Sequence, residues 1–145
     1  MKKLSKFLVF VIFALFLTAC SSSNLSEQEQ GYRDYQKMMV WKEQHKKLFF
    51  LYGVGLENRP IEKNKELLSM WKPMAKESAD KLNIKNDLAQ KYIDASLNAI
   101  YSLVDMLSFQ LEGNKKEAHK LFEISEKYAA EADNIEKELH NKFAK

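Results

Sequence analysis

Residues 114–143 read NKKEAHKLFEISEKYAAEADNIEKELHNKF, and this stretch decides the fold class. Apolar and small side chains return every three or four residues along it, and most of the positions between them are charged. Because an α-helix turns once every 3.6 residues, this spacing places the apolar side chains on one face of a long helix. That face comprises Ala118, Leu121, Phe122, Ser125, Tyr128, Ala129, Ala132, Ile135, Leu139 and Phe143.

The stretch directly before it predicts a second long helix, over residues 86–112. One apolar line is Leu88, Tyr92, Ala95, Ala99 and Met106, and the other is Ile93, Leu97, Ile100, Val104, Leu107 and Leu111. Two apolar lines indicate contact with neighbouring helices on more than one side. Gly113 ends this helix and Asn114 can cap the next one at once, so we expect a tight helical hairpin.

Two further helices are predicted upstream. The first begins at Ser26, which forms a capping-box pattern with Glu29, and it ends at the glycines of residues 53–55. The second begins near Pro60, and Pro73 inside it is expected to kink or divide the helix because it removes a backbone hydrogen bond. The apolar face of the first is Tyr35, Met38, Trp41, His45, Leu48 and Tyr52, and that of the second is Leu67 or Leu68, Trp71, Met74, Ala75, Ser78 and Leu82.

The four predicted helices account for the chain that follows the N-terminal segment. No segment alternates apolar and polar residues as a half-buried strand would. Short connections favour antiparallel neighbours, so the sequence predicts an all-α domain over residues 28–145, an antiparallel four-helix bundle with up-down-up-down topology. Cys20 is the single cysteine of the 145-residue chain, and the bundle therefore relies on packing without a disulfide.

The first twenty residues have a different composition. Lysines 2, 3 and 6 precede an apolar run over residues 7–16, which is short for a permanent membrane span, and Leu17-Thr18-Ala19-Cys20 follows. This junction resembles the lipobox of bacterial lipoproteins. The resemblance implies that residues 1–19 are a signal peptide cut between Ala19 and Cys20. It also implies that Cys20 carries diacylglycerol and fatty acyl chains such as palmitate, and that residues 20–27 form a lipidated cysteine and short flexible stalk. An ordinary signal peptide or an uncleaved anchor is the competing interpretation.

The charge balance and Ser21 bear on where the protein works. The chain has 23 basic and 20 acidic residues, and removal of the three leading lysines leaves 20 of each. A neutral domain argues against nucleic-acid binding, which needs an excess of positive charge. Ser21 stands where an aspartate would resemble an inner-membrane retention signal. The expected location is therefore extracytoplasmic, lipid-anchored to the cell membrane or the outer membrane, and the sequence leaves open which.

The histidines and methionines do not form a recognisable cofactor motif. A di-metal bundle site needs Glu-x-x-His, and no glutamate stands three residues before His45, His119 or His140. Haem held by Met38 or Met39 with His140 is disfavoured, because His140 falls in line with acidic residues of a solvated face. We expect His45 to be a hydrogen-bonded boundary residue. No catalytic residues, no metal and no cofactor are predicted.

Candidate partner-binding residues are Phe50, Tyr52 and Trp71. Residues 48–52 are five consecutive apolar residues, LFFLY, which cannot all face one core because each residue turns the helix by about 100°. Phe50 is a good candidate to be offered to a partner or to lipid headgroups, but burial under the loop of residues 53–60 is the slightly favoured interpretation. Trp71 precedes Pro73, so it lines a groove at a kink or belongs to the core.

Together these features predict a lipid-anchored, extracytoplasmic, non-enzymatic lipoprotein. It would bind a protein or peptide partner at the cell envelope, as an immunity or exclusion factor or as an accessory of an envelope complex. The alternative is a carrier that holds a small ligand or cofactor in the interior of the bundle.

Overall fold

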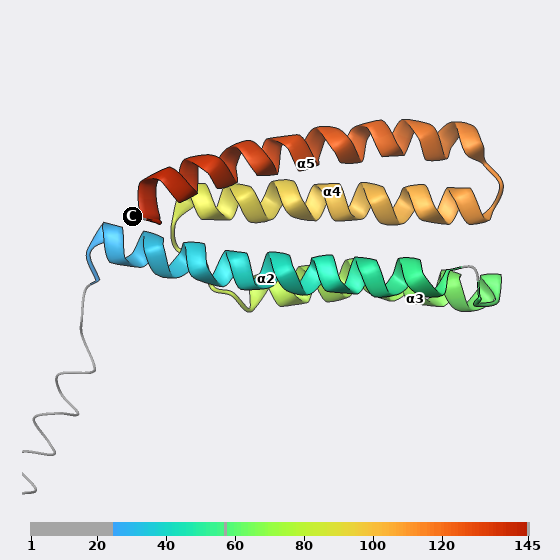
Figure 1. The fold of residues 1–145 in the computed structure, drawn as a ribbon, viewed down its shortest axis with the longest axis horizontal. Coiled ribbons are helices and arrows are strands. Elements are labelled where there is room, and N and C mark those ends of the chain that lie inside the picture. Colours follow the sequence, from blue (N-terminus) through green and yellow to red (C-terminus); the bar gives the residue numbers. More distant parts are fainter. Residues whose placement is uncertain (1–24, 57, 145) are drawn as a thin grey trace, which may run out of the picture.

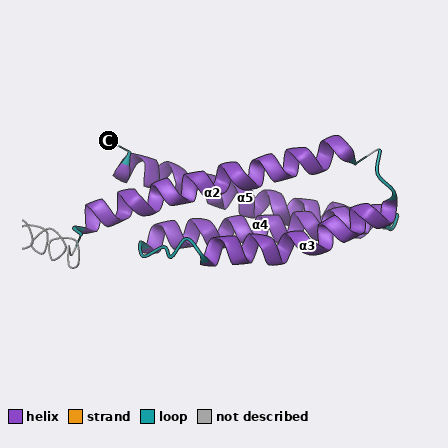
Figure 2. Ribbon diagram, turned by 90° about the horizontal axis from the view of Figure 1, so that it is seen from below, coloured by secondary structure: helices purple, strands orange, loops and turns teal. Residues whose placement is uncertain are grey.

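The computed structural model describes residues 25–56 and 58–144, and they form four long helices. These are α2 (Glu27–Gly55), α3 (Ile61–Asp80), α4 (Asp87–Leu111) and α5 (Lys115–Phe143). Successive helices run in opposite directions along a common axis, as Figures 1 and 2 show. The predicted all-α, up-down-up-down four-helix bundle is thus confirmed. The predicted lipobox, with Ala19 and Cys20, lies outside the described residues.

Local sequence signals set the helix ends. The hydroxyl of Ser26 accepts a hydrogen bond from the backbone N–H of Glu29, and the Glu29 carboxylate accepts one from the backbone N–H of Ser26. Both halves of the predicted capping box are therefore present. The side chain of Asn114 caps α5, directly after Gly113, which has a φ of +79°. The tight α4–α5 hairpin follows from these two residues.

Pro73 does not divide its helix. α3 continues through Pro73 from Ile61 to Asp80, although the proline has no N–H to donate. Trp71 and Ala75, on either side of the proline, are both buried in the core. This packing holds the helix together across the position where a local rule predicts a break.

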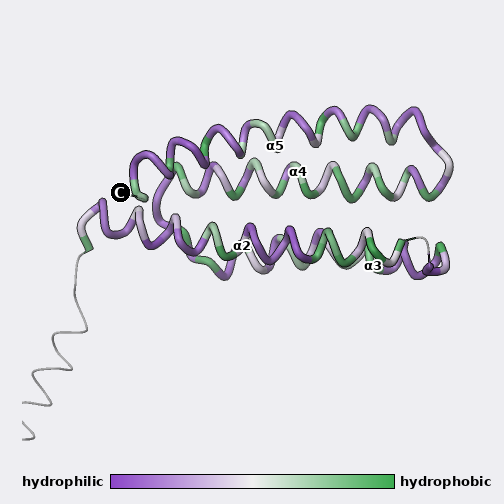
Figure 3. The backbone as a smooth tube through the Cα atoms, viewed as in Figure 1, coloured by the Kyte–Doolittle hydropathy of each residue, from purple (hydrophilic) through white to green (hydrophobic). Residues whose placement is uncertain are grey.

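The core is formed by residues from all four helices, with α4 the most hydrophobic of them (Figure 3). α4 and α5 make the most extensive helix–helix contact. Small residues permit this close approach: Ala95 and Ala132 are buried, and the Ser125 hydroxyl donates to the carbonyl of Ala99 across the two helices. The largest fully buried side chains are Trp41, Met38, Leu68, Ile93, Leu139, Asn64 and Asp34.

Asp34 ties α2 to the connection between α3 and α4. Its side chain is fully buried, and one carboxylate oxygen accepts hydrogen bonds from the backbone N–H groups of Lys85 and Asn86, at 2.7 and 2.8 Å. The other oxygen accepts from the Gln30 amide, and the Lys37 ammonium lies 3.6 Å from it. Burial alone would raise the pKa of Asp34, but these hydrogen bonds and the positive charge outweigh it and lower the pKa below its ordinary value.

Four side chains predicted for the apolar faces are exposed: Leu48, Met74, Phe122 and the smaller Ala129. Near the chain ends α2 and α5 touch, and the Gln28 amide donates to the Lys142 carbonyl. Among the hydrogen bonds and ion pairs of the described residues, Lys42–Glu136 is the α2–α5 interaction farthest from those ends. Farther from those ends, α2 and α5 still have apolar faces by helical spacing, but neighbouring helices cover these faces incompletely, as the exposed Leu48 and Phe122 show.

Candidate functional site

The three predicted partner-binding residues have different environments. Phe50 is 68% exposed, whereas Tyr52 and Trp71 are 7% and 5% exposed. The Tyr52 ring packs beside that of Trp71, with 5.8 Å between the ring centroids. Of the three side chains, Phe50 alone is available to a partner in this structure, and the other two support the helices that present it.

The connection between α2 and α3 does not cover Phe50, so the favoured interpretation that this loop buries it is wrong. Arg59 in this connection folds back so that its guanidinium donates to the carbonyl of Tyr52 and to the side chain of Asn64. The guanidinium also lies 5.0 Å from the centroid of the Tyr52 ring. The loop therefore covers the tyrosine and leaves the phenylalanine open.

Phe50 belongs to a larger group of exposed apolar side chains. Leu51 and Val54 accompany it on α2, within one helical turn, and Met70 and Met74 lie one turn apart on α3. Because Tyr52 contacts Trp71, Leu51 and Met70 lie at the same level of the two antiparallel helices. We call this group the α2–α3 apolar surface: Phe50, Leu51, Val54, Met70 and Met74.

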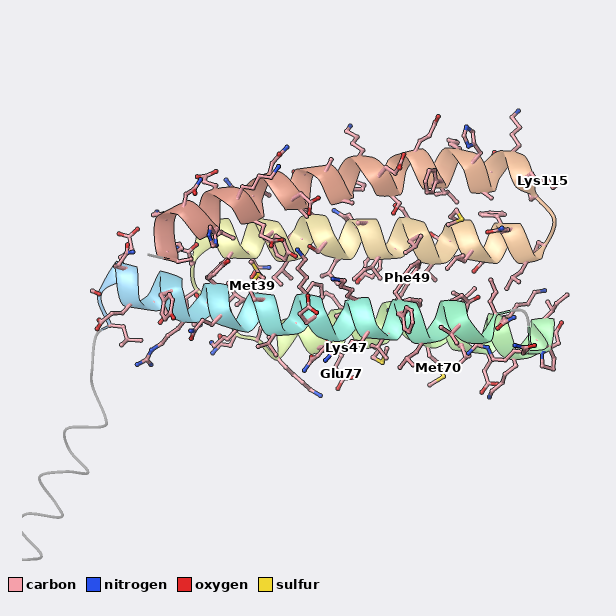
Figure 4. All side chains as sticks on the ribbon, in the orientation of Figure 1. Met39, Lys47, Phe49, Met70, Glu77 and Lys115 are labelled. Atoms are coloured by element: carbon pink, nitrogen blue, oxygen red, sulfur yellow. The ribbon has the colours of Figure 1, made fainter. Side chains whose placement is uncertain are left out.

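Charges of both signs border the α2–α3 apolar surface. In Figure 4, Lys47 and Glu77 lie on the same side of the bundle as Met70, and Phe49 points to the other side, toward α4. Glu77 is paired with Lys81 along α3. A group of exposed apolar side chains with charges of both signs around it is typical of a site for another macromolecule.

His45 is part of a buried hydrogen-bond network between α2 and α3. The Trp41 indole N–H donates to the Ser78 hydroxyl at 2.9 Å, and the His45 Nε2 lies 3.0 Å from the same oxygen. The His45 Nδ1 is buried without a hydrogen-bond partner. Burial lowers the pKa of His45, so the imidazole is neutral at pH 7. As expected, His45 is a hydrogen-bonded residue at the edge of the core.

The residues considered as haem ligands are not gathered around one space. Met38 has no exposed surface, whereas His140 is exposed and its Nδ1 lies 3.0 Å from the Tyr35 hydroxyl. Among residues 25–56 and 58–144, no group of three or more His, Cys, Asp or Glu side chains could hold a metal ion.

A pocket of about 180 Å³ opens between α2, α4 and α5. Sequence periodicity did not indicate it, because the pocket depends on how far α2 stands from the other two helices. The one signal in the sequence is the run of small residues on the facing sides of α4 and α5. Its lining consists of Trp41, Lys42, His45, Tyr92, Ser96, Ala99, Ile100, Ala129, Ala132 and Asp133. We call it the interior pocket.

Comparison of the chain with models of protein families, with curated proteins and with solved structures finds no match. Within the described part of the chain, every helix is too short or too polar to cross a membrane.

Proposed function

We propose that this protein is a lipid-anchored lipoprotein of the cell envelope that binds a protein or peptide through the α2–α3 apolar surface and catalyses no reaction. The observation that carries the binding proposal is the exposure of five large apolar side chains on two adjacent helices. Exposure of a large apolar side chain to water is unfavourable. A partner that covers these side chains removes them from water, as burial in a core would, and this burial favours binding.

The size of this surface indicates how tight such binding can be. Full burial of a Phe, Leu, Val or Met side chain contributes about 1.5–3 kcal/mol. The five side chains are between 42% and 68% exposed, so about half of that remains available at each, or about 5 kcal/mol in total. Association itself costs about 4–15 kcal/mol, so the surface alone supports weak binding. Confinement to one membrane with the partner raises the effective concentration and offsets part of this cost.

The lipid anchor rests on the sequence of residues 1–20. Two or three acyl chains on Cys20 hold a protein firmly, because each buried methylene contributes about 0.8 kcal/mol. Residues 21–26 would span at most about 20 Å when extended, which keeps the bundle near the bilayer. Partners within reach are then other envelope proteins, consistent with an immunity, exclusion or accessory role.

Site-specific photocrosslinking in cells tests the binding proposal. A photoreactive amino acid at position 50 should give an adduct with one envelope protein, which is identified by mass spectrometry. The same amino acid at position 126, which is exposed on α5, is the matched control and should give none. Absence of an adduct from position 50, or the same adducts from both positions, would show that the α2–α3 apolar surface is not the binding site.

A second experiment tests the anchor separately. Intact-mass analysis of the membrane-extracted protein should show a chain that begins at Cys20 and carries diacylglycerol and acyl mass. The Cys20→Ser variant should no longer be processed at this position. An unmodified thiol on Cys20 would contradict the anchor and leave the crosslinking result to stand by itself.

A further inference from the structure

The interior pocket is lined by α2, α4 and α5 at the level of Lys42. Its α4 and α5 sides carry Ser96, Ala99, Ala129 and Ala132, whose short side chains allow α4 and α5 to pack closely and leave space above them. The Lys42–Glu136 ion pair bridges α2 and α5 beside this space. Ala129 is exposed and Ala132 is buried, so the pocket runs from the surface into the core.

The α2 side of the pocket is an aromatic wall. The rings of Trp41 and His45 lie 4.5 Å apart, tilted by 52°. Both side chains are hydrogen-bonded to the Ser78 hydroxyl, which itself donates to the carbonyl of Ala75. Trp41 and His45 are therefore held in place before any ligand arrives, which reduces the entropy cost of binding.

The interior of the pocket is polar in places but uncharged. Burial raises the pKa of Tyr92 far above its ordinary value, so its hydroxyl stays protonated, and burial lowers the pKa of His45, so its ring stays neutral. The charged groups of the lining are Lys42 on α2, whose ammonium is paired with Glu136, and Asp133 on α5, which is exposed. A charged ligand would therefore lose hydration in the interior without gaining an opposite charge there.

We propose that the interior pocket binds one neutral, ring-sized organic molecule with an apolar body and a hydroxyl or carbonyl group. A cavity of about 150 Å³ holds a benzene molecule, so a pocket of about 180 Å³ accommodates one ring with a small substituent. Aromatic and alanine side chains favour the ring, and the Tyr92 and Ser96 hydroxyls can hydrogen-bond the polar group. Water in a largely apolar pocket is held loosely, and its displacement favours binding.

This site is separate from the α2–α3 apolar surface, and its existence does not depend on the proposed partner. It gives the carrier alternative a specific form, in which the ligand lies between α2, α4 and α5.

Benzyl alcohol is a suitable probe, because it is neutral and combines one ring with one hydroxyl. The chain has two tryptophans, and Trp41 lines the interior pocket whereas Trp71 does not. In a titration of the ¹⁵N-labelled full chain followed by NMR, the indole N–H signal of Trp41 should shift and saturate, with a Kd of about 1 mM or below. The Trp71 signal should stay in place.

Two matched variants locate the binding. Ala129→Leu places a larger side chain at the opening, and Ala and Leu are both good helix formers, so α5 should be retained. We expect it to weaken benzyl alcohol binding at least about tenfold. Ala130→Leu makes the same change one residue along, at an exposed position outside the pocket lining, and should bind as the unmodified chain does.

Intermolecular NOEs provide a test that needs no variant. At saturation the probe's ring protons should show NOEs to the methyl groups of Ala132 and Ile100. The proposal is overturned if these NOEs are missing, or if the two tryptophan signals shift equally or do not saturate. It is also overturned if a folded Ala129→Leu variant binds benzyl alcohol as the unmodified chain does.

Discussion

Replacement of Asp34 provides the sharpest test of how the bundle is held together. One oxygen of this buried carboxylate accepts both backbone hydrogen bonds from Lys85 and Asn86, so Asp34→Ala removes two bonds to a charged acceptor at once. Each such bond contributes about 1.5–3 kcal/mol. Because water can reach part of the vacated space, we expect a loss of about 3–5 kcal/mol in the free energy of unfolding, a large share of the 5–15 kcal/mol typical of a domain.

Asp34→Asn should cost less, about 1–2 kcal/mol, because the amide oxygen can still accept from both backbone N–H groups. What is lost is the negative charge and one acceptor toward the Gln30 amide. Urea unfolding followed by circular dichroism at 222 nm measures all variants. Asp94→Ala is the matched control, since Asp94 accepts from Gln90 in the same i, i+4 arrangement on the surface, and it should cost less than about 0.5 kcal/mol.

The pH dependence separates the charge from the shape of the side chain. The pKa of Asp34 is lowered in the folded protein, so its stabilisation is present above the ordinary value of 3.8 and is lost as pH falls through the lowered pKa. The difference between the unmodified chain and Asp34→Asn should therefore shrink in acid. If Asp34→Ala costs no more than Asp94→Ala at pH 7, the carboxylate does not hold the α3–α4 connection and the reasoning is refuted.

Three further predictions use the same unfolding assay. Gly31→Ala should lower stability by about 1–2 kcal/mol, because the added Cβ would overlap the buried ring of Phe143. This overlap outweighs the roughly 1 kcal/mol by which alanine favours a helix over glycine. In a Phe143→Leu background most of the loss should disappear. Gly113→Ala should lower the free energy of unfolding by about 1–2 kcal/mol, because the φ of +79° is unfavourable for alanine. Gly53→Ala should raise it by up to about 1 kcal/mol, because Gly53 lies inside α2 and an added Cβ would have no atom within 4 Å. Effects of the same sign for the two variants would contradict this prediction. Burial lowers the pKa of His45 from 6.5, so the contribution of its neutral ring to stability is complete above pH 6.5 and is lost as pH falls through the lowered pKa. His45→Leu should therefore lose less stability than the unmodified chain between pH 7 and pH 5. Equal losses would argue against this role of His45.

The helices were predictable because their signals are local. A capping box at Ser26, a glycine at position 113 and an asparagine at position 114 each act on backbone groups within four residues, whatever the rest of the chain does. The same locality explains why Pro73 does not divide α3, which was one of the two outcomes expected there. A rule based on one missing N–H has no access to the burial of the side chains on either side of the proline, and that burial keeps α3 continuous.

The candidate site was less predictable, because exposure depends on which helix lies opposite. The sequence singled out Phe50, and the structure leaves it exposed. The same apolar run also selected Tyr52, and the position before Pro73 selected Trp71, but these two side chains are buried together. Helical spacing already left Met70 off the predicted apolar face, but it placed Met74 on that face, where the structure leaves it exposed. Apolar spacing identifies a helix face but does not tell how much of that face a neighbour covers.

By itself, the sequence determined four helices, their ends, their up-down-up-down order and the lipobox-like start of the chain. These features follow from periodicity, capping chemistry and short connections, which operate over a few neighbouring residues. The tertiary structure alone decided that Asp34 binds a connection some 50 residues away, that the Lys42–Glu136 ion pair joins α2 to α5, and that a pocket opens beside this pair. Those features depend on the distances between helices, and packing of whole side-chain faces sets these distances.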